Sequence, residues 1–139
     1  MPQLAGLPLY FENPIGRFYE HPDGYVIIDY NAGPRNLETF QSFLHHLENL
    51  LKRRGWNKML GDHRRMDPFT EQEHDFINNQ WLQVSHALQQ EMQAAVLVTQ
   101  EVFTGLPAAL QQQDAREGVL LYHIFTEVDA ATAWLGQQA

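Results

Sequence analysis

Side chains that could do chemistry gather in one short stretch of the chain, residues 58–82, which read KMLGDHRRMDPFTEQEHDFINNQWL. Its ionisable and hydroxyl side chains include Asp62, His63, Arg64, Arg65, Asp67, Thr70, Glu73 and His74. An arginine beside the free amides of a helix start can hold a carboxylate or a phosphate. Arginine also pairs readily with carboxylates of its own chain. We therefore expect Arg64 or Arg65 to pair with Asp62 or Asp67 and fix the loop, with an anion site as the alternative.

Thr70 and Glu73 have the spacing of a capping box, in which each side chain bonds the backbone of the other residue at a helix start. A capping oxygen typically stabilises a helix by ~1 kcal/mol. The alternative role for Thr70 is phosphorylation, because a phosphate at a helix start is electrostatically favourable. We expect Thr70 to act as a cap.

The chain lacks a complete catalytic or metal-binding pattern. It has no cysteine, which removes thiolate nucleophiles and thiolate ligands. Its histidines do not form the paired helical patterns of zinc enzymes, and no glycine-rich phosphate loop is present. Ser42 and Ser85, the only serines, fall inside expected helices and outside any nucleophile elbow. We expect no catalytic residue, no metal and no cofactor, and hence a protein that is not an enzyme.

Composition limits the partners and the location. A length of 139 residues is typical of one domain, so residues 1–139 are expected to form a single one. The net charge of −8 would repel nucleic acid. No apolar run approaches the roughly 20 residues of a transmembrane helix. Residues 1–14 lack the basic start and long apolar core of a secretory signal, so we expect a cytoplasmic protein.

The elements that would position these side chains follow from hydrophobic periodicity and turn residues. Strands are predicted over residues 8–13, 16–20, 25–31, 56–61, 94–99 and 119–125. Helices are predicted from the cap Asn36 to about Arg54, from Thr70 to about Gln90 and weakly over 105–113. A closing helix is predicted that Thr126 opens with Asp129 and that finishes in Trp134-Leu135. This order predicts an α/β fold: a mixed β-sheet with antiparallel N-terminal strands followed by alternating β/α units, with helices packed on the sheet.

Three segments add a family resemblance to this pattern: KMLGDHRRMDPFTEQE, AAVLV and the carboxyl-terminal YHIFTEVDAATAWL. With the element order, they resemble the SpoIIAA-like, or STAS-like, domain family, which is related to anti-sigma-factor antagonists. The resemblance covers nearly the whole chain and implies a STAS-like sheet and a non-catalytic regulatory or protein-binding module. Phosphorylatable members of the wider family carry a serine motif at the corresponding helix start, and residues 62–70 lack it. The resemblance also permits a carrier of nonpolar ligands or a role near membranes.

The expected working surface is the loop of residues 62–70 with the helix after it. Its residues are Asp62, His63, Arg64, Arg65, Asp67, Phe69, Thr70, Phe76, Ile77 and Trp81. We expect this surface to bind a protein partner or a second copy of the chain. The alternative is a carrier or sensor of a small nonpolar ligand. If the helix after Thr70 stands slightly off the sheet, Phe76, Ile77 and Trp81 would line a groove for that ligand or for a partner helix.

Overall fold

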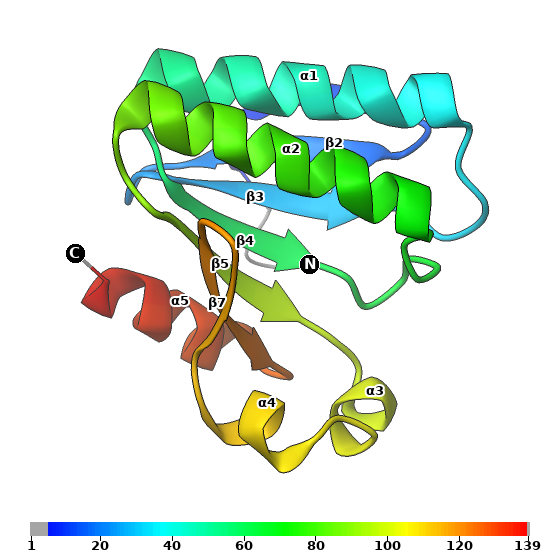
Figure 1. Ribbon diagram of the computed structural model, residues 1–139, viewed down its shortest axis with the longest axis vertical. Coiled ribbons are helices and arrows are strands. Elements are labelled where there is room, and N and C mark those ends of the chain that lie inside the picture. The colour runs from blue at the N-terminus through cyan, green and yellow to red at the C-terminus, as the bar shows by residue number, and fades with distance from the viewer. Residues whose placement is uncertain (1–5, 139) are drawn as a thin grey trace.

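A seven-stranded mixed sheet organises the computed structural model, which describes residues 6–138 (Figure 1). The strands are β1 (Leu9–Asn13), β2 (Gly16–His21), β3 (Tyr25–Tyr30), β4 (Lys58–Asp62), β5 (Met92–Leu97), β6 (Ala115–Glu117) and β7 (Leu120–Phe125). They lie in the order β1-β2-β3-β4-β5-β7-β6. Residues 1–5, part of the segment in which we predicted no secretory signal, lie outside the described residues, as does residue 139.

The pairing of the strands follows the predicted division of the chain. Strands β1, β2 and β3 form an antiparallel meander, and β3, β4, β5 and β7 are parallel neighbours. Every residue of β3 is buried, because this strand has neighbours on both edges and packing on both faces. The predicted α/β class, with an antiparallel start and later parallel strands, is confirmed.

Helices cover the two faces of the sheet unequally. Helices α1 (Leu37–Arg54) and α2 (Glu71–Leu88) pack on one face, where the core includes Phe18, Phe43, Leu47 and Val84. Helix α5 (Val128–Gln137) packs on the opposite face, around Leu60 and other alternate strand residues. The short helices α3 (Gln100–Thr104) and α4 (Ala108–Gln112) lie at the end of the molecule far from α1 (Figure 1).

Local signals fix the ends of α1 as predicted. The Asn36 side chain accepts a hydrogen bond from the Thr39 amide at 3.1 Å, which satisfies one of the free donors of the helix start. Gly55 ends the helix with φ 70°, a left-handed conformation that glycine adopts without steric cost. Helix α1 is therefore a scaffold whose boundaries its own sequence determines.

The carboxyl-terminal third departs from the prediction. Only α4 forms within the range 105–113 where a weak helix was expected, and Pro107 is the residue before it. Helix α3 lies before that range and was not predicted. Strand β6 was missed, because it has only three residues and two of them are charged. It folds back on β7 through Gly118, whose φ of 59° suits a tight turn. Helix α5 begins after Glu127 without a side-chain cap, so the predicted opening residue, Thr126, was wrong by one position.

Candidate functional site

A pocket of about 290 Å³ lies between α2 and the sheet. Strands β3, β4, β5 and β7 form its floor, α2 forms one wall, and the β6–β7 hairpin forms another. Its apolar lining consists of Ile28, Met59, Phe69, Ile77, Trp81, Ala94, Val96, Leu120, Tyr122 and Ile124. Its polar lining consists of Tyr30, His63, His74, Asn78 and Glu117. The pocket is thus mainly apolar with a few hydrogen-bonding groups, the usual character of a small-molecule site.

The pocket exists because no helix within residues 6–138 covers the far half of this sheet face. The connection between β5 and β7 places α3 and α4 away from α1 and α2, and the chain after β7 takes α5 to the opposite face (Figure 1). Val96 and Tyr122 therefore stay partly exposed on the floor. Gly61, which lies beside Val96 in the sheet register, adds no side chain to fill the space.

His63 lies at the carboxyl-terminal end of the parallel strands, directly after β4. Its amide donates to the carbonyl of Leu97 at 2.9 Å, which continues the strand pairing by one residue. Its imidazole meets the rings of Tyr30 and Phe69 edge-on, with centroids 5.2 and 5.7 Å away. A Cβ atom at residue 61 would lie only 3.0 Å from its Nε2 atom, so Gly61 leaves the room that this ring needs.

Burial keeps the polar groups at this end of the pocket uncharged. Burial lowers the pKa of His63 to about 4; the Asp62 carboxylate opposes this change, and the Arg35 guanidinium adds to it. Burial also raises the pKa of the Tyr30 phenol. Within residues 6–138 the ring nitrogens of His63 have no hydrogen-bond partner. A neutral imidazole with one donor and one acceptor is therefore available to the pocket.

Three polar side chains connect the walls of the pocket. The Asn78 amide donates to a Glu117 carboxylate oxygen at 3.3 Å, and the His74 Nε2 atom lies 3.7 Å from the other oxygen. His74 and Asn78 belong to α2, and Glu117 belongs to β6. These contacts are partly exposed, and contacts of that kind contribute little to stability. The two walls are therefore held together loosely.

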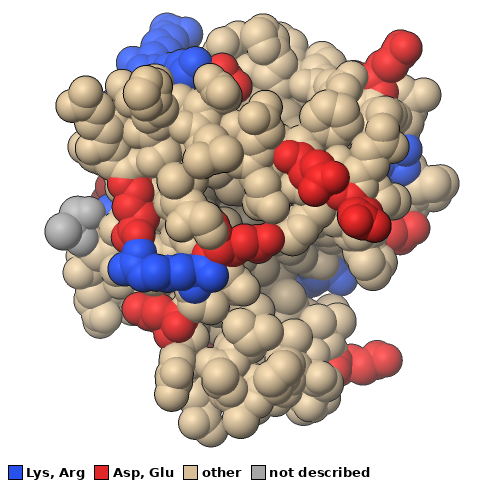
Figure 2. Space-filling model, in the orientation of Figure 1, with Lys and Arg blue, Asp and Glu red and all other residues tan. Residues whose placement is uncertain are grey.

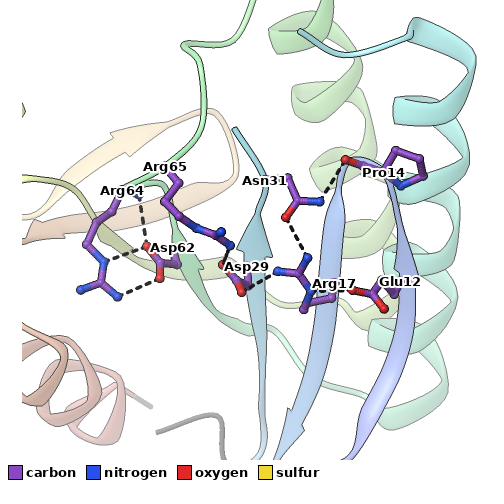
Figure 3. A network of polar contacts seen from close by, with 8 residues as sticks. All are labelled: Glu12, Pro14, Arg17, Asp29, Asn31, Asp62, Arg64 and Arg65. Atoms are coloured by element: carbon purple, nitrogen blue, oxygen red, sulfur yellow. Dashed lines mark hydrogen bonds and ion pairs between the residues drawn. The ribbon is translucent and has the colours of Figure 1, made fainter. Parts of the chain in front are cut away.

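The charged residues of the 62–70 loop lie away from the pocket. Successive strand residues point to opposite faces, so Asp62 and His63 face different sides of the sheet. Arg64 makes two side-chain hydrogen bonds to Asp62, both 2.9 Å long (Figure 3). Arg65 bonds Asp29 at 3.2 Å instead of Asp62 or Asp67. The prediction that arginine and aspartate pair to fix the loop is confirmed for Arg64 with Asp62 only.

Two carboxylates lie side by side in this cluster, since Asp29 of β3 pairs in register with Asp62 of β4. Arg17 bonds Asp29 at 2.7 Å and also contacts Glu12 and Asn31 (Figure 3). Burial acts to raise the pKa of Asp62, but the hydrogen bonds from Arg64 outweigh it and hold that pKa below its ordinary value. Each carboxylate is thus neutralised within the chain.

Removing Arg64 is expected to destabilise the fold. The Asp62 side chain is only 7% exposed, and Arg64→Ala leaves it with the backbone amide of residue 64 as its described donor. We expect a loss of about 1–3 kcal/mol in the free energy of unfolding, measured by urea denaturation at pH 7. Asp67→Ala is the control, because the Asp67 carboxylate accepts one bond of 3.3 Å from Gly33. Equal losses in both variants would contradict the loop-fixing role.

Thr70 and Glu73 form the predicted capping box. The Thr70 hydroxyl accepts from the Glu73 amide at 3.1 Å, and the Thr70 amide donates to a Glu73 carboxylate oxygen at 2.9 Å. Sequence reasoning missed the third member, Arg35, which donates to both oxygens of Glu73 at 2.9 and 2.8 Å. Arg35 also donates to the carbonyls of Asp67 and Pro68 and lies 5.0 Å from the Phe69 ring centroid. Arg35 therefore links the loop of residues 62–70 to the segment before α1.

The predicted working surface separates into three places. His63, Phe69, Ile77 and Trp81 line the pocket. Phe76 departs from the expected groove, because it lies on the other side of α2 and lines a shallower hollow against α1. The remaining predicted residues, Asp62, Arg64, Arg65, Asp67 and Thr70, belong to the loop cluster and the helix cap. Sequence reasoning missed the strand half of the pocket, although alternation along the strands marks those residues.

Further properties of the chain bear on the site. Within residues 6–138 no group of three histidine, aspartate or glutamate side chains is placed to hold a metal ion. No helix in the described part of the chain has both the length and the apolar character of a membrane span. Comparisons with protein-family models and with curated protein sequences found no match.

Proposed function

We propose that this protein is a non-catalytic binding module that takes a small, largely apolar ligand in the pocket between α2 and the sheet. The single observation that supports this most is the hollow of about 290 Å³ with its mainly apolar lining. An engineered apolar cavity of about 150 Å³ holds benzene, so this pocket has room for a two-ring molecule. The ligand would act as cargo or as a signal, which corresponds to the carrier or sensor role that the sequence offered as the alternative to a protein-binding module.

The floor of the pocket supports this proposal in detail. Two rows of residues, each paired across neighbouring strands, cross the floor of the pocket: Met59–Ala94–Tyr122 and Gly61–Val96–Ile124. Opposite them, Ile77 and Trp81 project from successive turns of α2, four residues apart. A flat apolar molecule placed between the strands and α2 would contact both walls and exclude water from these surfaces, which is favourable.

Val96→Phe is expected to abolish ligand binding without unfolding the protein. Val96 lies between Gly61 and Ile124 on the floor, so the ring of a phenylalanine there would extend into the hollow instead of into packed atoms. We expect affinity for the neutral fluorescent probe N-phenyl-1-naphthylamine to fall at least about tenfold, roughly 1.4 kcal/mol. The free energy of unfolding should change by less than about 1 kcal/mol. Fluorescence titration and urea denaturation measure the two quantities.

The matched control is Leu82→Phe, which makes a similar enlargement on α2 outside the pocket. Leu82 is 52% exposed. The variant Leu82→Phe should leave the binding of N-phenyl-1-naphthylamine unchanged. Unaltered binding in Val96→Phe, or an equal loss in both variants, would reject the pocket as the binding site.

A second proposal is that the protein is a cytoplasmic STAS-like regulatory module that binds a protein partner or a second copy of itself. Its support is the sequence resemblance together with exposed groups along the loop and α2, where the Arg65 side chain is 58% exposed and Leu82 is 52% exposed. Native mass spectrometry of protein purified from its own host separates the two proposals. A co-purified apolar molecule supports the carrier or sensor, and a stable dimer or heteromer without one supports the regulatory module.

A further inference from the structure

We infer, on the basis of the function proposed above, that the ligand is an uncharged apolar molecule with one hydroxyl or similar hydrogen-bonding group, which His63 binds. The pocket would then prefer such a molecule to the plain hydrocarbon of the same shape and to the corresponding carboxylate. The proposal depends on two features of the pocket: the position of the His63 ring and the signs of the charges around the lining.

The first feature is the unmatched imidazole. The His63 ring is held by aromatic edges of Tyr30 and Phe69 and by the missing side chain of Gly61. These neighbours fix the position of the ring, but they form no hydrogen bond with either of its nitrogens. His63 is only partly buried, so water can reach its ring nitrogens. A ligand that displaces this water must supply a hydrogen bond in its place, because leaving the group unpaired is costly. A hydroxyl group is well matched, because it donates and accepts as a neutral imidazole does.

The second feature is the absence of a suitable cation. No lysine or arginine is among the residues that line the pocket within the described chain, whereas Glu117 contributes a carboxylate. His74, the other ionisable base of the lining, already lies beside Glu117. The Arg35 guanidinium, which acts electrostatically on His63, makes a two-point bond to Glu73. An anionic ligand would therefore lose its hydration without gaining an opposite charge.

The surrounding surface agrees with this choice. The face of the molecule shown in Figure 2 is largely uncharged, and a basic group at its left lies directly beside acidic groups. The chain has a net charge of −8. Long-range electrostatic attraction therefore does not favour the approach of an anion. The residues that line the pocket then determine which ligand binds.

Three compounds of matched shape test the inference: naphthalene, 2-naphthol and 2-naphthoate. Their dissociation constants are measured at pH 7.5 by ligand-observed NMR titration of the full chain. We expect 2-naphthol to bind about three- to tenfold more tightly than naphthalene, the range of one neutral hydrogen bond. We expect 2-naphthoate to bind more weakly than either. Equal affinities for naphthalene and 2-naphthol, or tight binding of 2-naphthoate, would overturn the inference while the proposed apolar pocket stands.

His63→Phe identifies the group responsible. It keeps an aromatic ring against Tyr30 and Phe69 but removes both nitrogens, so the preference for 2-naphthol should disappear while naphthalene still binds. His86→Phe, at an exposed position of α2, is the matched control and should keep the preference. If the preference survives in His63→Phe, the inference is wrong.

A measurement on the unmodified chain protects the test against a variant that folds poorly. The ¹⁵N chemical shifts of the His63 ring should change with 2-naphthol and stay nearly constant with naphthalene, because only the first can hydrogen-bond. Identical ring shifts with both compounds would reject the inference. If neither these compounds nor N-phenyl-1-naphthylamine binds, the proposed function itself fails and the inference falls with it.

Discussion

Arg35→Met is expected to lower the free energy of unfolding by about 3–5 kcal/mol, the usual cost of removing one partner from a buried ion pair. The Arg35 and Glu73 side chains are only 5% and 6% exposed. Hydrogen bonds from Arg35 lower the pKa of Glu73, burial acts against this change, and the Thr70 amide adds a further bond. Methionine keeps most of the apolar stem of Arg35 but leaves the Glu73 carboxylate charged, buried and held by its capping bonds alone.

The loss extends to the wall of the pocket. Arg35 also holds the carbonyls of Asp67 and Pro68 and contacts the Phe69 ring, and Phe69 lines the pocket. Arg65→Met is the matched control: its side chain is 58% exposed, and its partner Asp29 keeps the bond from Arg17. We expect a change below about 1 kcal/mol in that variant. Urea denaturation at pH 7 measures the free energy of unfolding of both variants. Equal losses in Arg35→Met and Arg65→Met would contradict the role of Arg35 as the partner of a buried carboxylate.

Removing both charges separates the cost of the orphaned carboxylate from the loss of packing. The double variant Arg35→Met/Glu73→Gln should recover part of the stability lost in Arg35→Met, because an amide is easier to bury than an unpaired carboxylate. If the double variant is less stable than Arg35→Met, the orphaned charge of Glu73 was not the main cost.

Local sequence signals predicted much of the fold because they act over a few residues. Asn36, Gly55 and the Thr70–Glu73 box define helix ends through bonds within one helical turn. The Arg64–Asp62 pair was predictable for the same reason, as its members are two residues apart. By contrast, Arg35 lies 38 residues before Glu73, and nothing near it in the sequence indicates the pairing. Long-range pairing was therefore the part that sequence reasoning missed.

The pocket was only half predictable for a related reason. The α2 wall was visible as helical spacing of Ile77 and Trp81. The floor depended on which sheet face the connections leave uncovered, and that is decided by where the segments after β5 and β7 travel. The short charged strand β6, which supplies Glu117 to the pocket, has no alternating apolar pattern to mark it. Residues that are adjacent in the sequence, such as Asp62 and His63, also lie on opposite faces of the sheet.

Lowering the pH from 7 to 4 is expected to remove about 3 kcal/mol of stability through His63 alone. Its pKa is about 4 in the folded chain against an ordinary value of 6.5, and each unit of difference corresponds to about 1.4 kcal/mol. Between these values the unfolded chain binds the proton and the folded chain does not, so stability rises with pH. The contribution is fully present above pH 6.5 and is lost as the pH falls towards 4.

His63→Phe tests this dependence because phenylalanine keeps the ring and cannot take up a proton. Urea denaturation between pH 4 and 7.5 should give a flatter stability curve for His63→Phe than for the unmodified chain. The carboxylates of Asp62 and Glu73, whose pKa values are lowered, also contribute less stability on acidification. The Glu73 contribution is common to both proteins and cancels in the difference, whereas that of Asp62, on which His63 acts electrostatically, cancels only in part. His86→Phe should run parallel to the unmodified chain. If the curve for His63→Phe is parallel as well, His63 is not buried in its neutral form, and the neutral hydrogen-bonding group assigned to the pocket loses its physical basis.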